Sequence, residues 1–246
     1  MGAMPEEISG VIELLDSPQL EIFGMRTYTT GTINGIKTIV VFSRWGKVAA
    51  AATVSALIHH YNITELIFTG VAGAISPDLN IGDIVIASRL IQHDMDARPL
   101  MPRFEIPLLG KTHFETSQLQ IELAHKAITT VLNNGNLVEI VGRDVLNSFG
   151  INQPSLYTGD IASGDKFFAN NNDKNALYNI LPTVLCVEME GAAVAQVCYE
   201  YSVPFTIIRT ISDIADDNSH IDFPQFIKQV ASNYSVCIIR QLYSVL

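Results

Sequence analysis

The feature that most constrains the fold is a set of short apolar runs that alternate with helical patterns from about residue 40 onward. Leu66-Ile67-Phe68 and Phe205-Thr206-Ile207-Ile208 are typical of strands buried on both faces. The first run continues into the glycine-containing stretch 69–74, and the second ends in Arg209-Thr210-Ile211-Ser212-Asp213. The pattern predicts an α/β fold with one mixed, twisted sheet flanked by helices and with ligands bound at strand ends.

The other expected elements complete this alternation. A hairpin over 28–43 is predicted from two β-rich runs that flank Asn34-Gly35, a strong two-residue turn signal. Because we see no linker, repeat or shift of composition, we expect one domain over 1–246. Further strands are predicted at 83–91, 157–163, 184–187 and 204–211, helices at 47–61, 117–132, 172–181, 191–201 and 223–243, and a long irregular loop at 92–116.

Charge and composition exclude several function classes. The formal net charge is -10 with only 15 Lys and Arg residues, which argues against nucleic acid and anionic membranes as partners. No run approaches the roughly 18 apolar residues of a membrane span, and the first residues do not resemble a signal peptide. Cys186, Cys198 and Cys237 are odd in number and lack C-x-x-C spacing, so neither disulfides nor a thiolate zinc site is expected. We therefore expect a cytoplasmic protein.

Ionisable residues next to apolar strands are the first candidates for chemistry, because burying a charge is costly without a reason. Glu188 and Glu190 follow the run at 184–187 and would share one side if that strand continued. Two carboxylates beside a small-residue helix suit binding of a diol such as ribose, since each oxygen accepts hydroxyl donors. The alternative, a glutamate that interacts with the helix dipole, is equally compatible with these residues.

Asp213 follows the apolar strand at 204–211 and is a candidate general acid. Shielding from water would raise its pKa, as such a role requires. Ser212-Asp213 is also a good helix cap or turn, and the residues alone leave both interpretations open. Glu6-Glu7 would most often be dipole partners at a helix start.

Weaker signals come from glycine, histidine and aromatic residues. Gly70-x-x-Gly73 could let the backbone approach a ligand, but it matches neither a dinucleotide fingerprint nor a P-loop. His93-Asp94 lacks the partners of a metal site, so a surface loop and no bound metal are expected. Phe167-Phe168 could be core or could offer a ring on which a planar base stacks.

Taken together, the motifs resemble the 5′-methylthioadenosine/S-adenosylhomocysteine nucleosidases over essentially the whole chain. The specific part is the combination of Val187-Glu188-Met189-Glu190 with Ser212-Asp213. The other matching segments, in order, are Gly2-Ala3-Met4-Pro5-Glu6-Glu7, Gly46-Lys47-Val48-Ala49-Ala50, Thr69-Gly70-Val71-Ala72-Gly73, Ser163-Gly164-Asp165 and Arg209-Thr210-Ile211.

This resemblance implies a nucleoside phosphorylase-like fold, a homodimer, and hydrolysis of the adenine–ribose bond with water as nucleophile and no cofactor. It assigns the general acid to Asp213, oriented by Ser212, and the water-activating carboxylate to Glu7, with Arg209 nearby. Glu190 resembles the ligand of the ribose hydroxyls and Phe167 the ring that stacks on adenine. The remaining substrate contacts that it implies are Met4, Ala72, Gly73, Phe168, Val187, Glu188 and Met189.

Two regions depart from the family pattern. A strand precedes the Gly-Ala-Met segment in the family, whereas one residue precedes Gly2 here. The sheet is therefore expected to lack that strand, unless the natural start lies upstream. The loop over 97–116 differs from the family forms; there such a loop reaches the neighbouring subunit's site, a role that we assign to Leu100 and Pro107.

Three rival functions remain open on the sequence. A purine or uridine phosphorylase of this fold would need cationic ligands for phosphate, yet Phe68-Thr69 stands where such relatives carry an arginine. Aminofutalosine hydrolysis in menaquinone synthesis keeps the chemistry and changes the substrate, and Gln92-His93-Asp94 fits relatives with that activity. The third rival is a non-catalytic module that binds a nucleoside.

Overall fold

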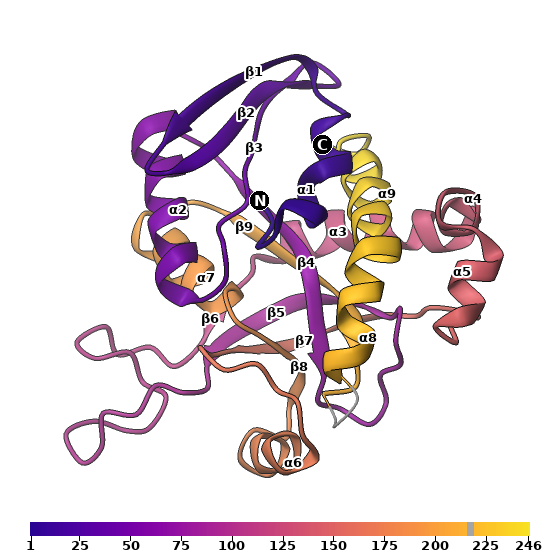
Figure 1. Ribbon diagram of the computed structural model, residues 1–246. Coiled ribbons are helices and arrows are strands. Elements are labelled where there is room, and N and C mark those ends of the chain that lie inside the picture. The colour runs from indigo at the N-terminus through magenta and orange to yellow at the C-terminus, as the bar shows by residue number, and fades with distance from the viewer. Residues whose placement is uncertain (216–218) are drawn as a thin grey trace.

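Six strands form the central sheet of the computed structural model, which describes residues 1–215 and 219–246 (Figure 1). The strand order is β6-β5-β7-β8-β4-β9, and a further pairing of β5 with β9 closes the sheet on itself. The prediction of a mixed α/β sheet is confirmed; its closure was not predicted, because apolar runs do not reveal which strands pair. The strands are β4 (Leu66–Ala74), β5 (Ile84–Gln92), β6 (Phe114–Glu115), β7 (Leu156–Ser163), β8 (Val184–Glu188) and β9 (Phe205–Asp213).

Helices cover the sheet on two sides and enclose two large apolar clusters. One cluster joins α1, α3 and α9 to the sheet, and the other joins α2 and α7 to its opposite side (Figure 1). The helical patterns of the sequence therefore mark the faces that are buried here. The helices are α1 (Pro5–Ile12), α2 (Lys47–Tyr61), α3 (Gln118–Asn133), α4 (Asn136–Val141), α5 (Arg143–Ser148), α6 (Asn171–Ile180), α7 (Gly191–Glu200), α8 (Ser219–Phe226) and α9 (Ser232–Leu242).

A separate three-stranded sheet contains the predicted hairpin. Its strands are β1 (Asp16–Phe23), β2 (Arg26–Ile33) and β3 (Ile36–Val40), in that order and antiparallel. Asn34 and Gly35 form the turn between β2 and β3, both with positive φ, as their residue types favour. The prediction did not include β1: all eight of its residues are exposed, so no buried–exposed alternation marks it as a strand.

The first two residues link the two sheets. The Met1 ammonium donates to the Ile67 carbonyl at 2.8 Å, and the Gly2 N–H donates to the Val41 carbonyl at 3.1 Å. Met1 and Gly2 therefore occupy strand positions between β3 and β4. This pairing fixes the start of α1, and so places Glu7 of that helix close to the backbone of β4.

Two helical regions differ from the sequence prediction. The C-terminal region, predicted as one helix over 223–243, consists of α8, a π-helical stretch (Ile227–Ala231) and α9. The short helices α4 and α5, which were not predicted, are separated by Gly142, whose φ of 91° ends one helix and begins the next.

In the described part of the chain, no helix combines the length and the apolar character that crossing a membrane requires.

Candidate active site

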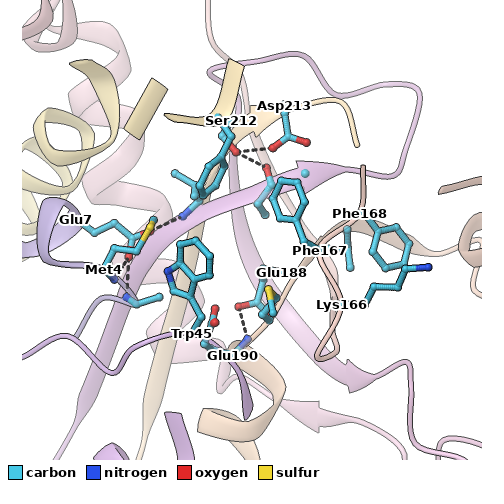
Figure 2. A pocket seen from close by; sticks show the side chains of 17 residues that line it. Met4, Glu7, Trp45, Lys166, Phe167, Phe168, Glu188, Glu190, Ser212 and Asp213 are labelled. Carbon is cyan, nitrogen blue, oxygen red and sulfur yellow. Dashed lines mark hydrogen bonds between the residues drawn. The ribbon is translucent and has the colours of Figure 1, made fainter. Parts of the chain in front are cut away.

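A cavity of about 580 Å³ opens where β4, β8 and β9 end beside the start of α1 (Figure 2). Its mixture of apolar walls and a few polar groups is typical of a small-molecule site. Most of the sequence-predicted site residues lie here although they come from distant segments. Those lining the cavity are Met4, Glu7, Ala72, Gly73, Phe167, Phe168, Val187, Glu188, Met189, Glu190, Ser212 and Asp213.

Glu7 lies in the cavity wall with its carboxylate held by backbone donors. Oε2 accepts from the N–H groups of Ala3 and Met4 at 2.6 and 3.0 Å, and Oε1 accepts from that of Val71 at 3.2 Å. Burial raises the pKa of Glu7, while the nearby Arg209 charge and these three N–H groups oppose the increase. Glu7 is thus a fixed carboxylate that takes up a proton more readily than a free glutamate does.

Asp213 ends β9 at another edge of the cavity. The Ser212 hydroxyl lies 2.8 Å from Asp213 Oδ2, and the Ala215 N–H donates to Oδ1 at 2.9 Å (Figure 2). Both residues are buried, and the same hydroxyl lies 3.4 Å from the Ala72 carbonyl. The carboxyl is therefore held in one orientation toward the cavity edge.

Each glycine of the Gly70-x-x-Gly73 segment makes room for one of these carboxylates. A Cβ on Gly70 would lie 2.8 Å from Glu7 Oε1, and one on Gly73 would lie 2.9 Å from Asp213 Oδ1. Such distances are too short for a side chain, so only glycine permits both approaches. The segment was expected to bring backbone near a ligand; here it brings β4 backbone near two acidic groups.

The Glu188 carboxylate is occupied by the protein itself. Oε2 accepts from Arg209 at 2.8 Å, and the N–H of Gly191 donates to both oxygens at 2.9 and 2.8 Å. Ser163 Oγ and the Glu190 N–H also donate to this carboxylate. Glu188 therefore anchors the start of α7 and the Arg209 charge, although it borders the cavity.

Glu190 is the second glutamate of the pair and immediately precedes α7. Its Oε1 accepts from the Gly46 N–H at 2.7 Å. Burial, followed by repulsion from Glu188, raises the pKa of Glu190 to about 8. With Glu188 occupied by internal donors, Glu190 is the glutamate of this motif that is suited to binding a ligand.

Arg209 lies behind the cavity wall and is 1% exposed. Its guanidinium donates to Glu188 and to the carbonyls of Phe68 and Ile208, and it packs over the Phe68 ring at 4.0 Å. A Cβ built on Gly70 would lie 3.4 Å from Arg209 Nη1 and 2.8 Å from Glu7 Oε1, so both groups adjoin this glycine. The buried cation therefore acts on the cavity through its electrostatic field.

Aromatic residues form the more open side of the cavity. Phe167 is half-exposed and meets Phe223 edge-on at 5.5 Å, whereas Phe168 is buried against His93. Trp45 also lines the cavity, is 59% exposed, and packs edge-on against Phe223 at 6.4 Å.

Five lining residues were missed by the sequence prediction. The one signal in the sequence for Trp45 was its place directly before Gly46-Lys47, a segment that matches the family. Phe223 reaches the cavity from α8, and no local pattern marks it. The five residues are Ala3, Trp45, Val71, Lys166 and Phe223.

Leu100 and Pro107 are not brought to the cavity of their own chain. Leu100 is 90% exposed, Pro107 is also exposed, and both lie on the loop between β5 and β6 that extends from the body of the molecule (Figure 1). Within the described residues, no cluster of three His, Cys, Asp or Glu side chains has the geometry of a metal site.

Comparison with known proteins places this geometry in a family. The model of the phosphorylase superfamily matches residues 1–242. A 5′-methylthioadenosine/S-adenosylhomocysteine nucleosidase of Bacillus cereus is 32% identical over 98% of this chain and 97% of its own.

Solved structures agree with this match. The Neisseria meningitidis nucleosidase of the same name, in complex with methylthio-immucillin-A, has a TM-score of 0.87 at 29% identity, covering 100% of this chain and 97% of its own. A futalosine hydrolase of Helicobacter pylori has a TM-score of 0.83 at 31% identity, covering 100% and 96%. The chain belongs to the phosphorylase superfamily and, within it, to the 5′-methylthioadenosine/S-adenosylhomocysteine nucleosidases.

Proposed function

We propose that this protein hydrolyses the N-glycosidic bond of 5′-methylthioadenosine and S-adenosylhomocysteine, releasing adenine and the 5-thioribose product. The observation that carries the proposal is the joining of Glu7, Glu190 and Asp213 in one cavity from three distant segments. The Bacillus cereus and Neisseria meningitidis relatives bear the name of this activity, and this chain matches each of them over 97% of its length. Because the family model spans 1–242, we infer one nucleosidase domain over 1–246.

Asp213 supplies the proton that adenine needs as a leaving group. In its protonated form it donates to an imidazole nitrogen of adenine as the bond between C1′ and the base breaks. Ser212 holds the carboxyl in place, and Phe167 offers a ring on which the base stacks. The departing base is thereby neutral instead of anionic.

Glu7 activates the attacking water on the other side of C1′. It removes a proton as the water oxygen bonds to C1′, so that one proton enters the adenine and another leaves the water. The ribose passes through an oxocarbenium-like state, which nearby carboxylates stabilise. Glu190 accepts hydrogen bonds from the ribose hydroxyls beside Met189. The proposal requires no metal and no organic cofactor.

Charge in the cavity supports water over phosphate as the nucleophile. Four carboxyl side chains line it, whereas Lys166 is the single basic residue among its described lining residues and pairs with Asp173 at 2.7 Å. A phosphate dianion would meet Glu7 without the cations that it requires. A phosphorylase would need basic side chains in the cavity wall to bind phosphate. A module that only binds a nucleoside would not need this set of acidic groups.

The test is adenine release from 5′-methylthioadenosine in phosphate-free buffer and again with phosphate added. We expect equal release in both buffers, followed by the absorbance change of adenine. Release that requires phosphate would identify a phosphorylase and remove the assignment of Glu7. Nucleoside binding without release in either buffer would support the binding module.

Aminofutalosine is a second candidate substrate, favoured by the similarity to the Helicobacter pylori futalosine hydrolase. The chemistry at C1′ would be the same, and only the 5′ substituent differs. A comparison of kcat/KM for aminofutalosine and 5′-methylthioadenosine separates the two. A ratio above one for aminofutalosine would assign the enzyme to that substrate.

A homodimer is proposed from the family resemblance and from the loop between β5 and β6. Leu100 and Leu108 are each at least 90% exposed on this loop, which is costly for apolar side chains on an isolated chain. In the proposed dimer, Leu100 and Pro107 reach the partner's cavity near the 5′ substituent. Sedimentation equilibrium should give twice the 27.0 kDa chain mass, and a monomer at all concentrations would contradict this.

The buried, unpaired state of the three cysteines supports the cytoplasm as the compartment. Expression with its native coding sequence followed by cell fractionation tests this assignment. Recovery outside the cytoplasmic fraction would remove it.

Trp45 provides a direct report of ligand binding, because it is the single tryptophan of the chain and lines the cavity. Adding 5′-methylthioadenosine to an Asp213→Asn variant, in which turnover should be slow compared with binding, should shift the indole emission to shorter wavelength as water leaves the cavity. The change should saturate, and Trp45→Phe should abolish it. An unchanged emission while equilibrium dialysis shows bound nucleoside would place Trp45 outside the substrate site.

A further inference from the structure

Outside the cavity, one lysine and two aspartates connect the start of a helix to two loops near Glu190. Lys47 Nζ lies 2.5 Å from Asp94 Oδ1 and 4.0 Å from Asp165 Oδ2. The Asp165 N–H donates to Asp94 Oδ2 at 2.9 Å. These three side chains, here called the Lys47 cluster, tie the start of α2 to the loops that follow β5 and β7. None of the three lines the cavity.

A backbone connection links the Lys47 cluster to the cavity. The Lys47 N–H donates to Asp165 Oδ1 at 2.9 Å, and the preceding Gly46 N–H donates to Glu190 Oε1 at 2.7 Å. Gly46 has a φ of 92°, a conformation that glycine adopts freely and that aims two successive N–H groups at two carboxylates. The location of the Gly46 donor therefore depends on how the first turn of α2 is held.

We propose that Lys47 is a positioning residue that, by clamping Asp94 and Asp165, holds the Gly46 N–H against the Glu190 carboxylate and so fixes that carboxylate for ribose binding. This inference rests on the proposed function, because it takes Glu190 as the ribose ligand. Lys47 is 16% exposed at its side chain, so its pairing is shielded more than at an open surface. Its partners are more open, with side chains 34% exposed for Asp94 and 51% exposed for Asp165, and ion pairs with such partners stabilise a fold little, which leaves positioning as the main consequence.

Charges around Glu190 make its hydrogen bond to Gly46 consequential. Glu188 on β8 and Glu7 on α1 repel its negative form, Arg209 on β9 attracts it, and the Gly46 N–H lowers its pKa. His93, beside the cluster, has a pKa lowered by burial, so it is neutral at pH 7 and above. Weakening the Gly46 bond will therefore raise the pKa of Glu190 further. As the pH falls, the ionised form of Glu190 will then be lost earlier, at a higher pH than in the wild type.

The first experiment compares Lys47→Met with the wild type and with Lys126→Met, an exposed lysine on α3 that serves as the control. We expect kcat/KM for 5′-methylthioadenosine to fall about tenfold, within the roughly hundredfold that a 1 Å misplacement costs. The acidic limb of its pH profile should move to higher pH. Lys47→Arg keeps the charge and should recover most of the rate, and Lys126→Met should match the wild type.

A double-mutant cycle with Glu190→Ala distinguishes positioning from general damage. If Lys47 acts through Glu190, then Lys47→Met should change the rate by less than about twofold in the Glu190→Ala background. Equal losses in both backgrounds, or no loss from Lys47→Met at all, would overturn the inference while leaving the proposed function intact. A wild type that releases no adenine from its nucleosides would remove the proposed function, and this inference with it.

Discussion

Replacing Asp213 by asparagine should lower kcat for adenine release by about 10³-fold, in the middle of the range for lost general acid catalysis. Asparagine keeps the shape and can still accept the Ala215 N–H, but it has no proton to give to the leaving base. Nucleoside binding should change little, because the contacts to the ribose lie elsewhere. Single-turnover release of adenine measures the rate, and equilibrium dialysis measures the affinity.

Ser212→Ala is the matched control for this variant. It removes the hydroxyl beside Asp213 Oδ2 and leaves the acid in place, so a loss of about tenfold is expected from poorer orientation. Turnover of the Asp213→Asn protein at the wild-type rate would end the assignment of Asp213 as the acid. A large loss of affinity with unchanged kcat would make it a binding residue instead.

Replacing Glu7 by glutamine should lower kcat by about 10²- to 10⁴-fold, the effect of losing a general base. The amide cannot accept the proton of the attacking water. Three backbone N–H groups donate to the two carboxylate oxygens of Glu7, whereas the amide offers a single acceptor oxygen. The free energy of unfolding should therefore fall by about 1–3 kcal/mol. Thermal unfolding monitored by circular dichroism measures that second effect separately from the rate.

Glu6→Gln is the control, since Glu6 is the exposed neighbour on the same helix turn and should leave both rate and stability nearly unchanged. The pH dependence of kcat/KM gives a further check. As the proposed base Glu7 must be ionised, and burial raises its pKa, so activity should be retained at higher pH and lost as the pH falls through that raised value. A wild-type rate for Glu7→Gln across the pH range would contradict the base assignment.

The strands and helices with strong local patterns could be predicted from the sequence. The helix over 47–61 matches α2 at both ends, because the sequence there is rich in alanine, the residue with the highest helix propensity. The argument that ionisable residues at strand ends are candidates for chemistry led to Glu188, Glu190 and Asp213, which all line the cavity. It could not separate Glu188 from Glu190, because their different roles depend on donors from β7, α7 and β9.

Residues that depend on distant contacts were beyond reasoning from local pattern. On its own residues Glu7 indicated a dipole partner; its place in the cavity depends on Val71, 64 positions away. Phe223 and Trp45 meet across most of the chain, and no spacing in the sequence encodes that meeting. Only the resemblance to a family pointed to Glu7, and nothing pointed to Phe223.

Closure of the sheet by β9 has a consequence for how the protein is made. β9 pairs with both β4 and β5, yet it begins at residue 205, so a ribosome must synthesise more than four-fifths of the chain before either partner can be covered. Until then the nascent protein exposes strand edges that favour association with other chains. Long-range pairing of this kind is slow. The proposed acid at the end of β9 thus arrives last, and a shortened chain that stops before it should be inactive.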